Sequence, residues 1–242
     1  MGIPLTSTLS NLYLNGRWLL PSARTDNQVT LHAYLTNISL TAQDDYYEWE
    51  IDGKIENRYN TGTVYTLLRE QLPLVNWSRA VWIKGGVPRQ SFLCWLFVLN
   101  RCPTKDRILG WGLQTDPKCL LCANLPESRD HLLFVCGFSW SIWSRVASRS
   151  QKIAHRDWAS TISTMQSLRG PRENTRLSLL AWQTTIYNIW TERNQRLHRN
   201  TFRSVDTILQ IIDSTIRNRI SGFRDTNPNL RSGMMQRWLR NH

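Results

Sequence analysis

Four potential metal ligands within one short segment constrain this chain more than any other feature. They follow the pattern C-x2-C-x8-H-x4-C and are Cys119, Cys122, His131 and Cys136. Zinc in proteins is held by four such donors in a tetrahedron at about 2.0–2.3 Å, and four protein ligands leave no open position for water. The pattern therefore predicts one structural Zn²⁺, and not a catalytic metal. The alternative is that this segment is a degenerate copy of a metal-binding sequence, in which the cysteines are free reduced thiols and the segment no longer folds around a metal.

The spacing of the last two ligands limits the local structure. His131 and Cys136 are five residues apart, which is about 500° of regular helix, so they cannot share a helix face. One of the two must lie where the helix has ended, and Gly137, directly after Cys136, is the expected end.

The chain carries a large excess of positive charge. Its formal net charge is +12 over 242 residues, and Arg outnumbers Lys 25 to 5. The excess lies in residues 71–150, with net +6, and in residues 151–242, with net +9, whereas residues 1–70 have net −3. Arginine binds phosphate through paired hydrogen bonds and stacks on bases. The composition therefore favours a nucleic-acid partner over a basic face that is merely solvated.

Cysteine usage and hydropathy limit the compartment. With three of the five cysteines at metal-ligand spacing, the chain suits a reducing environment, and Cys94 and Cys102 are expected to be buried apolar thiols. The longest apolar run, residues 92–99, is too short to span a bilayer, so no membrane partner is expected.

The pattern of apolar residues predicts a mainly α fold. Alternating residues on both sides of Asp52-Gly53 indicate a small β-hairpin near residues 47–59. Pro88 suits the first position of a helix, and amphipathic helices are expected over 175–197 and 205–220. The fold class is thus a helical domain with a small N-terminal β-hairpin and a central CCHC zinc-binding loop.

An ordered set of residues accompanies the metal ligands. The set contains Trp77, Trp82, Pro88-Arg89, the run 92–96, the run 102–109, Glu127-Ser128, the run 131–134 and Trp143. With the C-x2-C pair and Cys136, it resembles the reverse transcriptase zinc-binding domain of plant LINE-type (non-LTR) retrotransposons. The resemblance covers roughly residues 63–145, with Cys102 in place of the family's usual Leu before Pro-Thr.

Composition and the resemblance together predict a division of the chain into four parts. They are an irregular spacer over 1–45, a reverse transcriptase zinc-binding domain over 46–148, a linker over 149–175 and a basic helical C-terminal region over 176–242. The linker contains Gly170-Pro171, and the tail after Asn227 is expected to be loose.

No catalytic constellation is visible, so the chain is not expected to be an enzyme. A polymerase needs an aromatic-x-Asp-Asp turn, but the adjacent pair Asp44-Asp45 has Ala42 at the aromatic position. The six acids of residues 151–242 are scattered along helices, whereas ribonuclease H needs four carboxylates around two metal ions.

The leading interpretation is a zinc-stabilised, non-catalytic nucleic-acid-binding module, detached from a retroelement polyprotein. By resemblance, such a module helps to hold template RNA or target DNA for reverse transcription, and its expected protein partner is a reverse transcriptase polymerase region in trans. The candidate phosphate contacts are Arg101, Lys105, Arg107, Lys118, Arg129, Arg193 and Arg196. The tryptophans Trp82, Trp95, Trp111 and Trp143 are expected to be core residues more than base-stacking platforms.

Two alternatives remain open. The zinc and tryptophans could build a scaffold whose helix around residues 186–190 docks a protein partner, or the chain could be a retroelement relic with no selected role. Charge and resemblance favour the nucleus over the cytoplasm.

Overall fold

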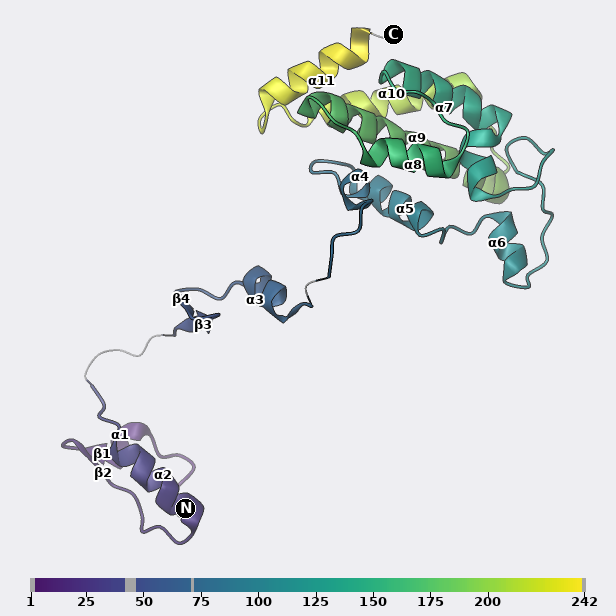
Figure 1. Ribbon diagram of the computed structural model, residues 1–242. Helices are drawn as coiled ribbons and strands as arrows, with labels where there is room; N and C mark the ends of the chain where they lie inside the picture. Colours follow the sequence, from purple (N-terminus) through teal and green to yellow (C-terminus); the bar gives the residue numbers. More distant parts are fainter. Residues whose placement is uncertain (1–2, 42–46, 71, 241–242) are drawn as a thin grey trace. The chain divides into compact units, whose positions relative to one another are not determined.

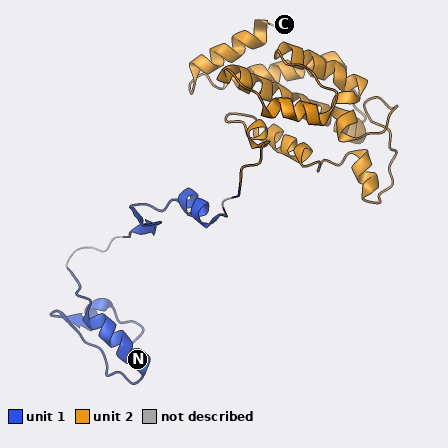
Figure 2. Cartoon of the chain, viewed as in Figure 1, with its two compact units in different colours: residues 1–72 blue, residues 73–242 orange. Residues whose placement is uncertain are grey.

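The computed structural model describes residues 3–41, 47–70 and 72–240. Contacts divide the chain into two compact units, residues 1–72 and residues 73–242 (Figure 2). The predicted mainly α fold with a small hairpin is confirmed. Asp44-Asp45 and residue 46, the predicted start of the zinc-binding domain, lie outside the described residues.

The described residues of unit 1 form two small hairpins and three helices. Its elements are α1 (Leu9–Leu12), β1 (Tyr13–Leu14), β2 (Arg17–Trp18), α2 (Asp26–Thr36), β3 (Trp49–Ile51), β4 (Lys54–Glu56) and α3 (Thr61–Leu68). β3 and β4 are antiparallel, with Glu50 opposite Ile55. Both turn residues between them, Asp52 and Gly53, have positive φ, as the expected Asp-Gly hairpin requires.

The prediction that residues 1–45 are irregular was wrong for the described part. Asn15 and Gly16 have positive φ and close a hairpin of the same kind between β1 and β2. The side chain of Thr25 accepts a hydrogen bond from the Gln28 amide and caps α2. Turn and cap chemistry therefore organise this segment, although its apolar residues show no clear period.

Unit 2 is a helical bundle around one long helix. Its elements are α4 (Ser78–Val81), α5 (Pro88–Val98), α6 (Lys105–Gly110), the π-helix η1 (His131–Val135), α7 (Gly137–Arg149), α8 (Trp158–Gln166), α9 (Arg172–Arg199), α10 (Val205–Ser221) and α11 (Pro228–Arg240). α9 packs against α5, α7, α10 and α11 (Figure 1). Among the helices of the described residues, none is long and apolar enough to cross a membrane.

Two predicted irregular segments instead contribute to the core of unit 2. The predicted loose tail forms α11, which buries Leu230, Met234 and Trp238, four residues apart along one face. The predicted linker contains α8, where Asp157 caps the helix and Trp158 is buried. A few apolar residues are enough to dock these two helices, because each of these side chains is buried against the rest of the bundle.

Candidate metal centre

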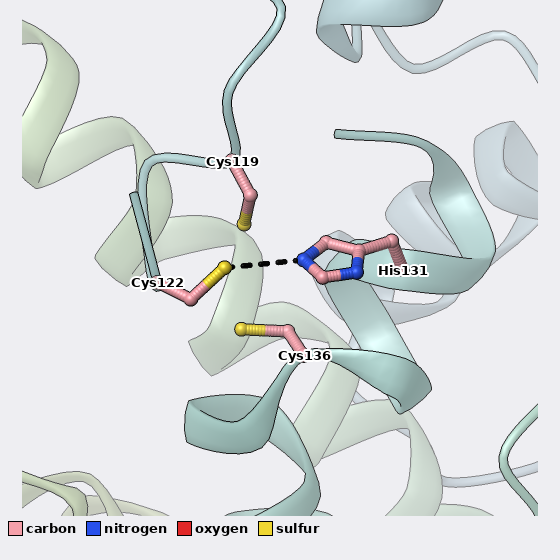
Figure 3. Close-up of side chains that lie close together, drawn as sticks. All are labelled: Cys119, Cys122, His131 and Cys136. Carbon is pink, nitrogen blue, oxygen red and sulfur yellow. Dashed lines mark hydrogen bonds between the residues drawn. The ribbon is translucent and has the colours of Figure 1, made fainter. Parts of the chain in front are cut away.

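The four predicted ligands converge in unit 2 (Figure 3). Their ligand atoms all lie within 4.8 Å of one another, and Cys122 Sγ is 3.3 Å from His131 Nε2. A tetrahedral zinc site with ordinary bond lengths separates its donors by roughly 3.6–3.8 Å. The donors are therefore spaced as a zinc ion needs, with adjustments of about an ångström.

The first two ligands lie on a tight turn, here called the metal turn and defined as residues 118–126. It is closed by a bridge between Lys118 and Pro126 and by the Cys119 amide, which donates to the Leu125 carbonyl at 2.8 Å. The Leu121 amide lies 3.4 Å from Cys119 Sγ. Backbone donors thus already face a sulfur where thiolate charge would develop.

The other two ligands are separated by a π-turn. The Cys136 amide donates to the His131 carbonyl at 2.7 Å, which is the five-residue hydrogen bond of a π-helix. Cys136 itself has φ −53° and ψ 128° and lies outside the helix. The prediction that one ligand lies beyond a helix end is confirmed, but Gly137 begins α7 instead of ending a helix.

The environment of the sulfurs prepares one of them for metal binding. A hydrogen bond from the Cys119 thiol lowers the pKa of Cys136 to about 5, helped by the Ser139 and Phe138 amides at the start of α7. The same hydrogen bond, together with burial, raises the pKa of Cys119. A zinc ion would remove the remaining thiol protons, since coordinated thiols are deprotonated.

Glu127 follows the metal turn directly and links α6, the metal turn and α9. It was not predicted as a site residue from the sequence. Its buried carboxylate accepts hydrogen bonds from the Lys105 amide at 3.1 Å and the Leu120 amide at 3.4 Å. It also pairs with Arg193 of α9, whose Nη2 lies 2.9 Å away. Arg193 is only 3% exposed at its side chain, so the prediction that it contacts phosphate was wrong.

Arg196 supports the metal turn from the same helix. Its Nη1 donates to the Leu121 carbonyl at 2.9 Å, and its Nε donates to the buried Glu192 at 2.9 Å. Its guanidinium also lies 4.5 Å from the centre of the Phe138 ring. These contacts occupy the side chain, so Arg196 holds the turn in place and is not presented as a phosphate contact.

The remaining predicted phosphate contacts divide by exposure. Lys105 is buried at 5% exposure, so that prediction was wrong as well. Arg129 and Arg107 are half-buried, each over a tryptophan ring at 4.6 and 5.3 Å. Arg101 and Lys118 are exposed. These two keep the exposure that phosphate binding requires.

The other two cysteines behave as expected. Cys94 and Cys102 are buried free thiols, and burial raises the pKa of Cys102 to about 12. Both are therefore apolar core residues with little thiolate character.

The tryptophans depart from the expected core role in part. Trp143 is buried at 1% exposure, but Trp82 and Trp111 are 51% and 52% exposed. About half of the surface of each of these two side chains is thus exposed.

The donor set and its geometry agree with the comparison of the chain with known families. Residues 59–143 match the family described as zinc-binding in reverse transcriptase. The match contains all four ligands and Glu127, while Arg193 and Arg196 lie beyond its end. No curated protein and no solved structure matches the chain. Together, the family match and the cluster of three sulfurs and one imidazole identify a site for one structural zinc ion.

Proposed function

We propose that this protein is a zinc-stabilised, non-catalytic nucleic-acid-binding module, detached from the polyprotein of a plant LINE-type retroelement. The observation that carries the proposal is the match of residues 59–143 to the zinc-binding family of reverse transcriptases. The net charge of +12 supports it, since a basic chain attracts a polyanion.

In this proposal the zinc ion has a structural role. It fixes the metal turn and the start of α7, and α9 holds the turn through Arg193 and Arg196. The exposed side chains of Arg101 and Lys118 contact phosphates of template RNA or target DNA. The protein works in the nucleus, with a polymerase region supplied in trans.

The buried acids support a non-catalytic role. Glu127 and Glu192 are fully buried, and each pairs with an arginine of α9. Carboxylates engaged in this way stabilise the bundle and are not available to bind catalytic metal ions.

The salt dependence of binding tests the proposal. Fluorescence anisotropy with a labelled 20-nucleotide RNA, between about 50 and 200 mM salt, is expected to show log affinity falling linearly with log salt, with a slope of about −0.7 for each phosphate neutralised. The variant Arg101→Gln/Lys118→Gln should flatten the slope relative to the parent. Affinity that does not change with salt would contradict the proposal.

A second candidate function is protein interaction, favoured by unit 1. None of its described helices has a buried residue, and Leu14, Val29 and Tyr34 are each more than half exposed. The docking stripe expected around residues 186–190 is not available, because Ile186 and Ile189 are each 1% exposed. A strictly monomeric protein that binds no apolar dye would count against this function.

A further inference from the structure

A pocket remote in sequence from the metal ligands gathers uncompensated positive charge. It has a volume of about 530 Å³ and lies between the loop after α4, the start of α9 and the end of α10. Four cations line it: Lys84, Arg172, Arg176 and Arg219. We call it the cation pocket.

No salt-bridge partner among the described residues balances these four cations. No acidic residue lines the pocket, and in the described part of the chain none of the four forms a salt bridge. Elsewhere on α10, by contrast, arginines are balanced by an acid: Asp213 forms salt bridges with two of them. Burial, and then the neighbouring Arg172, lower the pKa of Arg176. The cation pocket is thus a site of mutual repulsion that an anion would relieve.

The pocket wall is held in a defined geometry. Arg219 Nε donates to the Gly85 carbonyl at 2.6 Å, which fixes the loop to the end of α10. Gly85 has φ +79°, and a Cβ at this position would lie 2.5 Å from the Phe223 ring. Only glycine fits both the backbone conformation and the close approach. The loop therefore carries Lys84 at a set position beside Arg219.

An apolar pocket adjoins the cation pocket. It has a volume of about 430 Å³ and shares Lys84, Gly85 and Arg219 with it. Its lining includes Trp82, which is 51% exposed and packs against Trp95 with ring centroids 6.5 Å apart. A supported aromatic face thus lies next to the four cations.

We propose that these two pockets together bind one segment of single-stranded nucleic acid, with a backbone phosphate in the cation pocket and a base stacked on Trp82. The proposal rests on the proposed nucleic-acid-binding function and gives it a site. Arginine and lysine bind phosphate as paired donors or point charges, and stacking on aromatic rings is how proteins bind unpaired bases of any sequence. In a duplex the bases are already stacked on one another, so the aromatic face selects for single strands.

Charge variants with a matched control test the phosphate site. Lys84→Gln/Arg172→Gln removes two exposed cations of the pocket, and Arg58→Gln/Arg69→Gln removes two exposed cations of unit 1. The probe is a labelled single strand of about 20 deoxythymidines, called dT20. For the pocket variant, the slope of log affinity against log salt should be flatter than for the parent by about 0.7 for each lost phosphate contact. The control should stay close to the parent. Equal changes in both variants would overturn the proposal while leaving the proposed function intact, whereas a parent that does not bind would overturn both.

The thermal stability of the same variant provides a second readout. Because the cations repel one another, Lys84→Gln/Arg172→Gln should raise the Tm of the free protein, as measured by circular dichroism. It should also reduce the increase in Tm that dT20 produces in the parent. A lower Tm without ligand, with an undiminished increase on adding dT20, would show that the cations are merely structural and would contradict the proposal.

The stacking step has its own test. Trp82→Leu keeps an apolar side chain but removes the aromatic face, and it should weaken binding of dT20 by at least about fivefold. Binding of an abasic strand of the same length should not change. Equal loss on both strands would overturn the stacking step, and an unchanged zinc content would confirm that the variant is folded.

Discussion

Replacing Arg193 with methionine removes the cation from the buried pair that joins α9 to the metal turn. The partner carboxylate of Glu127 is 0% exposed at its side chain. It would lose its contacts to Arg193 Nε at 3.2 Å and Nη2 at 2.9 Å. Its remaining side-chain partners among the described residues would be two backbone amides at 3.1 and 3.4 Å. Removing one partner of a buried ion pair typically costs about 3–5 kcal/mol, because the other charge stays buried and unpaired. We expect a loss of that size in the free energy of unfolding.

Urea denaturation of the zinc-loaded protein, followed by circular dichroism, measures this loss. Arg199→Met is the matched control, because Arg199 is on the same helix and is exposed; it should change stability by less than about 0.5 kcal/mol. The double variant Glu127→Gln/Arg193→Met should recover most of the loss, since it leaves no buried charge. A cost for Arg193→Met no larger than that of the control would refute the view that this pair fixes the metal turn to α9.

Two further predictions concern the packing of α11. Trp238→Ala should lower the free energy of unfolding by about 3–5 kcal/mol, because the side chain is 1% exposed. Leu239 is exposed, so the control Leu239→Ala should change this free energy by less than about 1 kcal/mol. Equal effects of the two variants in urea titrations would contradict the packing of α11. Although burial raises it, the Trp238 indole and then Arg149 and Arg217 hold the pKa of Asp213 below its usual value. The stability that this carboxylate contributes is therefore present above about pH 4 and is lost as the pH falls further. Between pH 5 and 3, the urea midpoint of Asp213→Asn should therefore change less than the urea midpoint of the parent. Identical pH profiles would show that Asp213 does not contribute.

Local sequence patterns predicted the metal ligands and the hairpin. Cys119 and Cys136 lie close in the chain, and their donor chemistry is specific enough to identify the cluster before any folding is considered. Asp52-Gly53 and Pro88 were predictable for the same reason, since each restricts its own backbone conformation, the first to a hairpin turn and the second to a helix start. These features need no knowledge of what packs against them.

Long-range pairing could not be predicted in the same way. Glu127 and Arg193 are 66 residues apart, and nothing in either local sequence indicates that they meet. Net charge counts Arg193 as a cation equal to Arg172, although one is buried in an ion pair and the other is exposed. The tail after Asn227 was expected to be loose, because its few apolar residues, Leu230, Met234 and Trp238, become a buried stripe only against the surface of the bundle.

Metal analysis of the purified protein tests the central claim most directly. The parent and the variant Cys94→Ala/Cys102→Ala, which leaves all four ligands in place, should each contain one zinc ion per chain. The variant Cys119→Ser/Cys122→Ser should contain none and should melt at a lower temperature. A parent that is folded by circular dichroism yet takes up no zinc at equimolar concentration would contradict the account.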